Sequence, residues 1–202
     1  DPWLASLRAK LGFADAKFTY GLIFNKKPKA PRTFWHQDGT VWNTDLAYQD
    51  DAPEILQLHY LEGSDKDYGA LRVLPGTHRL RHELHGILAA IPKGDLRSAK
   101  DTKTMPFATF PDEITINTKP GDMVLLDARL LHATHANNMD TARMCVTLSY
   151  LSTDALANEE VLARYTRKID GFDLSTPIPY IPKGLPPELE AAYKQYLPPR
   201  YS

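Results

Sequence analysis

The sequence predicts a mainly β protein, an antiparallel double-sheet jelly roll with a few peripheral helices. Three observations lead to this prediction. The middle of the chain is a succession of short apolar or β-branched segments, clear turn signals separate them, and few stretches there have helical spacing. In such a fold, side chains that are far apart in the sequence can meet inside the mouth of the barrel. Functional residues are therefore expected near both ends of this region.

Composition and charge describe one soluble globular domain. The 202 residues include 24 Lys and Arg against 25 Asp and Glu, and 43% are hydrophobic, which suffices for a core and a pocket. A net charge of −1 provides no long-range field for nucleic acid or an anionic membrane. No apolar run approaches the roughly 20 residues of a membrane span. The sequence therefore favours a local site for a small-molecule substrate and leaves the oligomeric state open.

The single cysteine and the N-terminal residues give indications of the cellular compartment. The single Cys145 cannot form an internal disulfide, which fits a reducing environment. Its apolar neighbours indicate a buried thiol rather than a catalytic one. The first residues do not resemble a signal peptide. We therefore expect a cytoplasmic location.

The N-terminal part is expected to hold a short helix and then a strand. Residues 3–11 carry apolar side chains at helical spacing, and Gly12 would end the helix. Residues 18–24 are aromatic and β-branched, as a strand requires. The basic loop 26–31 then interrupts this strand. A solvated turn is one interpretation of the loop, and a site for an anionic substrate group is the other.

His36 and Asp38 lie in the next expected strand and turn, residues 34–42. Side chains two positions apart on a strand project from the same face, so this imidazole and carboxylate can reach one metal ion. A second histidine would complete the facial triad that holds non-haem Fe(II). Trp35 and Trp42 lie beside the pair, either as walls of a substrate pocket or as core packing.

The rest of the predicted core alternates strands and turns. Residues 45–53 are polar and suit a loop at the mouth of a pocket, and Pro75-Gly76 is a strong turn signal. Residues 87–112 have little period and are expected to form a lid or a flexible segment. The expected strands are residues 54–61, 70–74, 114–117, 123–127 and 143–151.

Four other histidines leave alternatives open. His59 in the strand 54–61 is either a metal ligand or, as we favour, a hydrogen-bonded strand residue. The spacing of His78, His82 and His85 would place them on one side of a helix. They lie in a polar stretch without a carboxylate in a clear ligand pattern, which argues against a separate metal site.

The C-terminal quarter differs in character. Residues 158–170 and 186–197 are expected to form helices, with Pro and Tyr residues between and after them. We therefore expect a single domain, residues 1–202, with a core of about 18–151 and a helical, Pro/Tyr-rich arm of about 152–202. Because the chain starts without Met, we also expect its N-terminal helical region to be incomplete.

His132 is the natural second histidine for the pair His36 and Asp38. It follows a turn and a buried strand at the late end of the core. Further along, Arg143 brings a guanidinium group that suits a carboxylate bidentately. Thr134 can add a hydroxyl to the same carboxylate.

These residues lie in stretches that resemble the phytanoyl-CoA dioxygenase family of Fe(II)- and 2-oxoglutarate-dependent oxygenases. The matching stretches are Trp35-His36-Gln37-Asp38, residues 69–79, residues 121–126, and Leu131-His132-Ala133-Thr134 with Asn137 and Arg143. Their order and approximate intervals match over roughly residues 18–151. The resemblance implies a cupin-like double-stranded β-helix with His36, Asp38 and His132 as iron ligands. It also implies that Arg143, with Thr134, binds the distal carboxylate of 2-oxoglutarate.

The resemblance implies a dioxygenase that uses Fe(II), 2-oxoglutarate and O2. It would hydroxylate an unactivated C–H bond of a small molecule and release succinate and CO2. Trp35, Trp42 and Tyr48 are expected to line the substrate pocket. Asp38 disfavours halogenation, because a halide ligand generally needs the carboxylate position vacated. The alternatives are a metal-binding jelly-roll protein without turnover and an O2-independent cupin-type metalloenzyme, neither of which requires Arg143 with Thr134.

Overall fold

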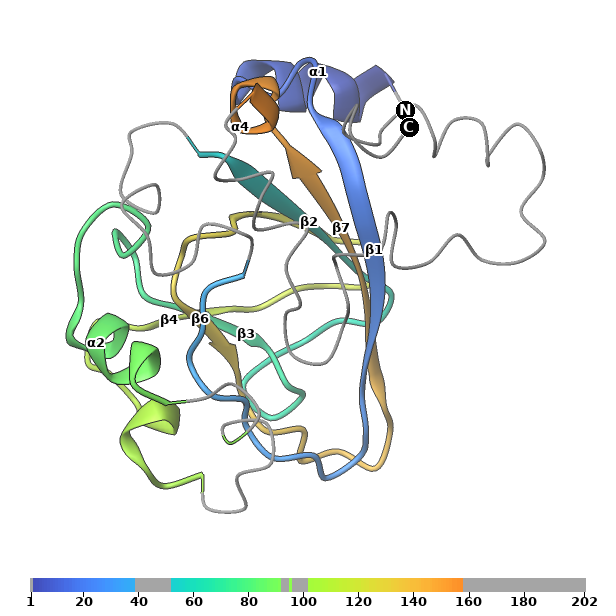
Figure 1. Cartoon of the computed structure of the whole chain (residues 1–202). Coiled ribbons are helices and arrows are strands. Elements are labelled where there is room, and N and C mark those ends of the chain that lie inside the picture. The colour runs from blue at the N-terminus through green and yellow to red at the C-terminus, as the bar shows by residue number, and fades with distance from the viewer. Residues whose placement is uncertain (1, 39–51, 92–94, 96–101, 158–202) are drawn as a thin grey trace. The chain divides into compact units, whose positions relative to one another are not determined.

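The computed structural model describes residues 2–38, 52–91, 95 and 102–157 (Figure 1). The chain divides into two compact units, one of residues 20–149 and the other of residues 1–19 with 150–202. Every described residue predicted to bind metal or 2-oxoglutarate falls in the first unit. A single domain over all 202 residues stays a prediction.

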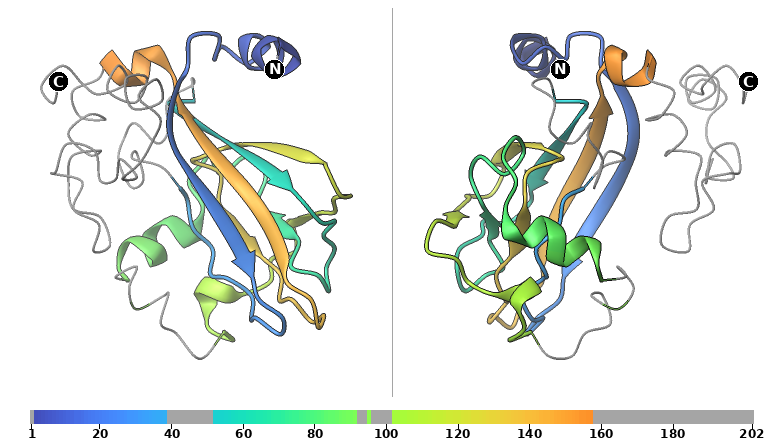
Figure 2. Two further views of the ribbon diagram at one scale, coloured as in Figure 1. Left: turned by 90° about the vertical axis from the view of Figure 1, so that its right-hand side faces the viewer. Right: turned by 60° about the vertical axis from the view of Figure 1, so that its left-hand side comes forward.

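Two antiparallel sheets carry the fold, which confirms the predicted jelly roll. The four-stranded sheet has the order β1 (Lys17–Lys26), β7 (Arg143–Leu151), β2 (Glu54–Tyr60), β5 (Met123–Asp127). The three-stranded sheet has the order β4 (Ile114–Ile116), β3 (Leu71–Val73), β6 (His132–Thr134). Figure 2 shows β1 and β7 side by side, although they come from opposite ends of the described chain. Every one of these strands lies at or within two residues of a predicted strand, except β6.

Strand β2 lies inside the four-stranded sheet, between β7 and β5, and nearly all of it is buried. It pairs with β5 in antiparallel register, with Leu56 opposite Leu126 and Leu58 opposite Val124. The sequence pattern left open which face of β2 looks inward. The structure places Leu56 and Leu58 in the apolar core. Because side chains alternate along a strand, Ile55, Gln57 and His59 lie on the opposite face.

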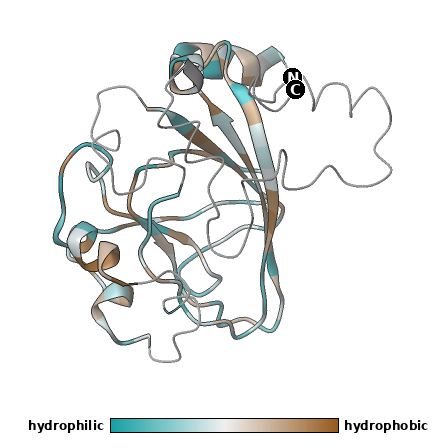
Figure 3. Cartoon of the chain, in the orientation of Figure 1, coloured by the Kyte–Doolittle hydropathy of each residue, from teal (hydrophilic) through white to brown (hydrophobic). Residues whose placement is uncertain are grey.

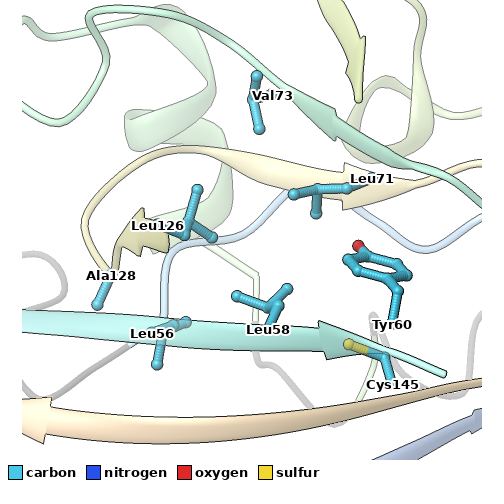
Figure 4. Packing of buried hydrophobic residues seen from close by; sticks show 8 residues of the cluster. All are labelled: Leu56, Leu58, Tyr60, Leu71, Val73, Leu126, Ala128 and Cys145. Atoms are coloured by element: carbon cyan, nitrogen blue, oxygen red, sulfur yellow. The ribbon is translucent and has the colours of Figure 1, made fainter. Parts of the chain in front are cut away.

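The main core joins residues from both sheets (Figure 4). Its buried members are Leu56, Leu58, Tyr60, Leu71, Val73, Leu126, Ala128 and Cys145. Each large aliphatic side chain buried here contributes about 1.5–3 kcal/mol to folding. The prediction of a buried thiol is confirmed, since Cys145 is 2% exposed and burial raises its pKa.

A second apolar cluster includes the helix α2 (Glu83–Ala89), whose hydrophobic residues are visible in Figure 3. Leu84 and Leu88 lie four residues apart and share one face of the helix. The cluster consists of Trp35, Leu74, Leu84, Leu88, Phe110, Leu131 and Ala133. Helix α2 was not predicted: it begins at Glu83, within the polar stretch of residues 79–86. The side chain of His82 caps the helix by accepting a hydrogen bond from the Leu84 N–H at 3.2 Å. Histidine is not among the usual capping residues, so the sequence did not indicate the start of this helix.

The described part of residues 87–112 is less irregular than predicted. It holds the end of α2 and a 3₁₀ turn, η2 (Met105–Phe107), and the side chains of Phe107 and Phe110 are buried. Among the terminal helices, α1 (Pro2–Lys10) confirms the predicted N-terminal helix, and α4 (Thr153–Ala157) follows β7. The predicted helices 158–170 and 186–197 lie outside the described residues. None of the described helices is long and apolar enough to cross a membrane.

A buried ion pair fixes the segment before β4 to the three-stranded sheet. Arg72 of β3 is 0% exposed, and its guanidinium donates to both oxygens of Glu113, at 3.0 and 2.5 Å. It also donates to the Ala108 carbonyl at 2.8 Å and lies 4.6 Å from the centre of the Trp35 ring. Burial acts to raise the pKa of Glu113, but the hydrogen bonds from Arg72 and from the Phe110 N–H outweigh it and lower that pKa.

We predict that Glu113→Gln lowers the free energy of unfolding by about 3–5 kcal/mol, because it leaves the Arg72 charge buried without its partner. Since the pKa of Glu113 is depressed, the stabilising contribution is present at neutral pH and is lost as the pH falls below the ordinary range of a glutamate. Urea unfolding at several pH values measures both effects. The neighbouring Asp112 is exposed, so Asp112→Asn is the matched control. An equal stability of the two variants would contradict the stabilising role of the Arg72–Glu113 ion pair.

Candidate metal centre

Two backbone hydrogen bonds join His36 to His132. The His36 N–H donates to the His132 carbonyl and the His132 N–H donates to the His36 carbonyl, each at 2.9 Å. The residues thus form an antiparallel bridge, and side chains directly opposite in such a pair lie on the same face. Their ring centroids are 4.3 Å apart. The fold therefore brings together two predicted ligands that are far apart in the sequence.

Asp38 faces both imidazole rings. Its Oδ1 lies 3.8 Å from His36 Nε2, and its Oδ2 lies 3.5 Å from His132 Nε2. The Asp38 N–H donates to the Ala128 carbonyl at 2.8 Å, which ties this residue to the end of β5. One ligand atom from each of the three side chains lies within 4.8 Å of the others. Within the described part of the chain, no other group of three His, Cys, Asp or Glu side chains meets this condition.

Backbone carbonyls set the orientation of both rings. His36 Nδ1 lies 2.9 Å from the Phe34 carbonyl, and His132 Nδ1 lies 2.9 Å from the Leu130 carbonyl. Because a carbonyl only accepts, each Nδ1 carries the proton in a neutral ring, and each Nε2 keeps its lone pair. Both lone pairs belong to the nitrogens nearest Asp38. Two neutral imidazole nitrogens with one carboxylate are the donor set that suits non-haem Fe(II).

The segment that carries His36 and Asp38 buries its alternate side chains. Trp35 and Gln37 are 0% and 1% exposed, and the Trp35 Nε1 donates to the Ala108 carbonyl at 2.8 Å. The structure places Trp35 in the core, which is one of the two interpretations that the sequence left open for this residue. The physical reason is the period of two along an extended chain. Trp42 and Tyr48, the other predicted pocket residues, lie outside the described residues.

The other histidines have local roles. The Gln57 amide lies 2.5 Å from His59 Nε2, in keeping with the interpretation of His59 as a hydrogen-bonded strand residue. His82 and His85 form the capping box of α2. Neither these residues nor His78 join the described group that can hold a metal ion.

Arg143, the predicted carboxylate-binding residue, is a buried cation at the start of β7. Its side chain is 3% exposed, its Nη2 donates to the Gly69 carbonyl at 3.1 Å, and its guanidinium lies 5.3 Å from the centre of the Tyr60 ring. Its Nε has no hydrogen-bond partner. Because a buried unsatisfied donor is costly, this guanidinium is suited to an anionic ligand.

Lys26, at the end of β1, is a second cation in this region and the first residue of the basic loop 26–31. Its Nζ donates to Thr134 Oγ1 at 3.0 Å and to the Pro31 carbonyl at 2.8 Å. Burial, and next the charge of Arg143, lower the pKa of Lys26 to about 8. The predicted hydroxyl of Thr134 is therefore present, and the ammonium group of Lys26 donates a hydrogen bond to it.

The basic loop 26–31 thus divides into residues with different environments. Lys29 pairs with Asp140 at 2.9 Å, and these side chains are 63% and 91% exposed. Lys29 is therefore part of a solvated turn, whereas Lys26 points into the protein.

Tyr20, Ser149 and Glu54 form a buried polar group near Asp38. Tyr20 of β1 is hydrogen-bonded to Ser149 of β7, and Ser149 donates to the carboxylate of Glu54 on β2. Ser149 and Glu54 are each 0% exposed. Burial, with the charges of Glu54 and Asp38, raises the pKa of Tyr20 well above its ordinary value. Its hydroxyl is therefore a permanent hydrogen-bond donor, and no spacing in the sequence could have linked three residues from three strands.

Comparison with known proteins gives one family match. A family model described as phytanoyl-CoA dioxygenase (PhyH) matches residues 1–145. No curated protein sequence matches the chain. The family match therefore covers both histidines, the carboxylate and Arg143.

Several solved structures share the fold. EvdO2 from Micromonospora carbonacea var. aurantiaca, complexed with 2-oxoglutarate, is 24% identical with a TM-score of 0.53, over 74% of this chain and 58% of that chain. AviO1 from Streptomyces viridochromogenes Tue57 is 21% identical with a TM-score of 0.51, over 74% of this chain and 57% of that chain. The epimerase SnoN, in complex with Fe3+, alpha ketoglutarate and nogalamycin RO, is 21% identical with a TM-score of 0.51, over 75% of this chain and 56% of that chain. The chain thus spans less than two thirds of the length of each structure.

We predict that the protein binds one Fe(II) and that His36→Ala or His132→Ala weakens this binding at least about 100-fold, since each removes one of three ligands. Anaerobic titration of the protein with Fe(II) against a competing chelator measures the affinity. His59→Gln, which changes a histidine outside the group, should bind Fe(II) as tightly as the unmodified protein. Equal losses in all three variants would refute this site.

Proposed function

The chain belongs to the phytanoyl-CoA dioxygenase family, and on this premise we propose that it is an Fe(II)- and 2-oxoglutarate-dependent dioxygenase. It hydroxylates an unactivated C–H bond of a small molecule and releases succinate and CO2. The observation that carries this proposal is the convergence of His36, Asp38 and His132, whose ligand atoms lie within 4.8 Å of one another. The donor set and the uniform orientation of both rings support iron as the metal.

His36 Nε2, His132 Nε2 and the Asp38 carboxylate hold the iron in this proposal. Three protein ligands on one side leave positions for the co-substrate. When bound, Fe(II) with 2-oxoglutarate and O2 supplies the oxidising power for C–H cleavage. The chain contributes the fixed ring orientations and a surrounding core that limits the access of water.

Arg143 and Thr134 bind the distal carboxylate of 2-oxoglutarate. Thr134 follows His132 by two positions on β6, so both side chains leave the same face. Two residues along a strand span about 7 Å, a length that suits a five-carbon diacid reaching from the iron to Thr134. The buried guanidinium of Arg143 and its unpartnered Nε supply the countercharge.

The outcome of the reaction is part of the proposal. The epimerase SnoN shares this fold, so the fold alone does not determine the product, because function depends on the site. Asp38 disfavours halogenation, since it occupies the position that a halide ligand would need. A pocket for a small-molecule substrate, lined in part by Trp42 and Tyr48, stays a prediction. A cytoplasmic location also stays a prediction.

We predict that anaerobic addition of Fe(II) and 2-oxoglutarate produces the weak visible charge-transfer band of the iron–co-substrate complex. His132→Ala should abolish this band because it removes an iron ligand. Arg143→Ala should keep Fe(II) binding but raise the Kd for 2-oxoglutarate at least about tenfold, because it removes a charge-assisted pair. Absence of the band in the unmodified protein would refute the proposed function.

Turnover separates the dioxygenase from the two alternatives. In air, the Fe(II)-loaded protein should form succinate slowly from 2-oxoglutarate even without added substrate, and mass spectrometry of succinate measures it. A protein that binds metal without turnover would form none. A cupin-type metalloenzyme of another class would keep its activity without O2.

A further inference from the structure

Lys26 and Arg143 place two positive charges in one region without a carboxylate partner. The ion pairs found among the described residues include neither side chain, and the single hydrogen bond of Arg143 goes to a carbonyl. Like charges that approach in a poorly solvated region repel. The lowered pKa of Lys26 is consistent with this repulsion and with burial. An anion bound there would relieve both costs.

Several contacts hold the Lys26 side chain in its place. Gly69 has a φ of +66°, and a Cβ at this position would lie 2.6 Å from Lys26 Cδ. The lysine stem therefore passes close to Gly69, and a side chain at this position would require the stem to shift. The Asn137 amide donates to the Lys26 and Lys27 carbonyls, each at 3.1 Å, and fixes the backbone at the end of β1. A long flexible side chain is thus held in one direction.

Free donors remain on both cations. A lysine ammonium has three N–H donors, and the described hydrogen bonds of Lys26 use two of them, to Pro31 and Thr134. Arg143 keeps its Nε without a partner. Thr134 contacts the ammonium of Lys26 and lies on the same face of β6 as His132. The free donors therefore lie in the region that the proposed function assigns to the distal carboxylate.

We propose that Lys26 is a co-substrate-binding residue that, together with Arg143 and Thr134, binds the distal carboxylate of 2-oxoglutarate. This inference rests on the proposed function, since it names a further determinant of the same co-substrate site. Lys26 gives the site selectivity for 2-oxo acids that carry a second carboxylate. A purely structural lysine, in contrast, would hold the Pro31 carbonyl and be indifferent to the charge of the ligand.

The test compares two ligands of equal chain length in the Fe(II)-loaded protein under anaerobic conditions. 2-Oxoglutarate has the distal carboxylate, and 2-oxopentanoate has a methyl group in its place. We expect Lys26→Met to raise the Kd for 2-oxoglutarate at least about tenfold and to leave the Kd for 2-oxopentanoate within about twofold. Lys26→Arg should keep most of the selectivity because it keeps the charge. The charge-transfer band reports binding of both ligands.

Lys29→Met is the matched control for this test, and two outcomes would overturn the inference. Lys29→Met removes an exposed lysine of the same loop and should bind both ligands as the unmodified protein does. Lys26→Met overturns the inference if it binds 2-oxoglutarate unchanged, or if it loses affinity for both ligands equally, as a structural defect would. Neither result affects the band in the unmodified protein. If that band is absent, the proposed function itself fails, and this inference fails with it.

The pH dependence provides a second test that does not require loss of the side chain. With a pKa of about 8, Lys26 of the free protein loses its charge above this pH, so the affinity for 2-oxoglutarate should fall as the pH rises from 7 to 9.5. In Lys26→Arg this fall should disappear. Among the facing groups, burial raises the pKa of Tyr60 to about 12, and a guanidinium group is always charged in proteins. The same fall in Lys26→Arg would overturn the assignment.

Discussion

The backbone pairing of His36 with His132 is the constraint on which the site depends. Reciprocal hydrogen bonds of 2.9 Å fix the two residues opposite each other and direct both rings to one face. Asp38 follows at the spacing that returns its carboxylate to this face, and the Nδ1 contacts to Phe34 and Leu130 turn each Nε2 toward it. A shift of register by one residue would send the side chains to the opposite face. The ligand geometry is therefore a property of the strand pairing and not of the side chains alone.

Strand β6 connects the metal centre to the anion-binding region. His132 at its start faces Asp38, and Thr134 at its end accepts a hydrogen bond from Lys26. The cations come from β1 and β7, which are neighbours in the four-stranded sheet. In the proposed function, the length of this short strand sets the distance between the iron and the cations that bind the distal carboxylate. The buried guanidinium of Arg143 and the partly buried ammonium of Lys26 have no carboxylate partner among the described ion pairs.

Much of this could be predicted from the sequence, because local rules govern it. The alternation of strand side chains predicts that His36 and Asp38 share a face, and the strands 123–127 and 143–151 are predicted at their observed bounds. The basic loop 26–31 was a candidate for an anionic group, but the sequence could not distinguish Lys26 from Lys29, because only the sheet pairing brings Lys26 near Thr134 and Arg143. Helix α2 was missed because a histidine caps it. For Trp35, the sequence left a pocket wall and core packing open, and the alternation that identified the metal pair favours the core position that the structure shows.

The central claim is that His36, Asp38 and His132 hold one iron ion whose co-substrate extends toward the cations of Arg143 and Lys26. A crystal structure grown anaerobically with Fe(II) and 2-oxoglutarate tests it most directly. The account predicts that both Nε2 atoms and the Asp38 carboxylate bind the iron, and that the distal carboxylate contacts Arg143, Thr134 and Lys26. Iron bound elsewhere, or a co-substrate whose distal carboxylate points away from Arg143 and Lys26, would contradict it.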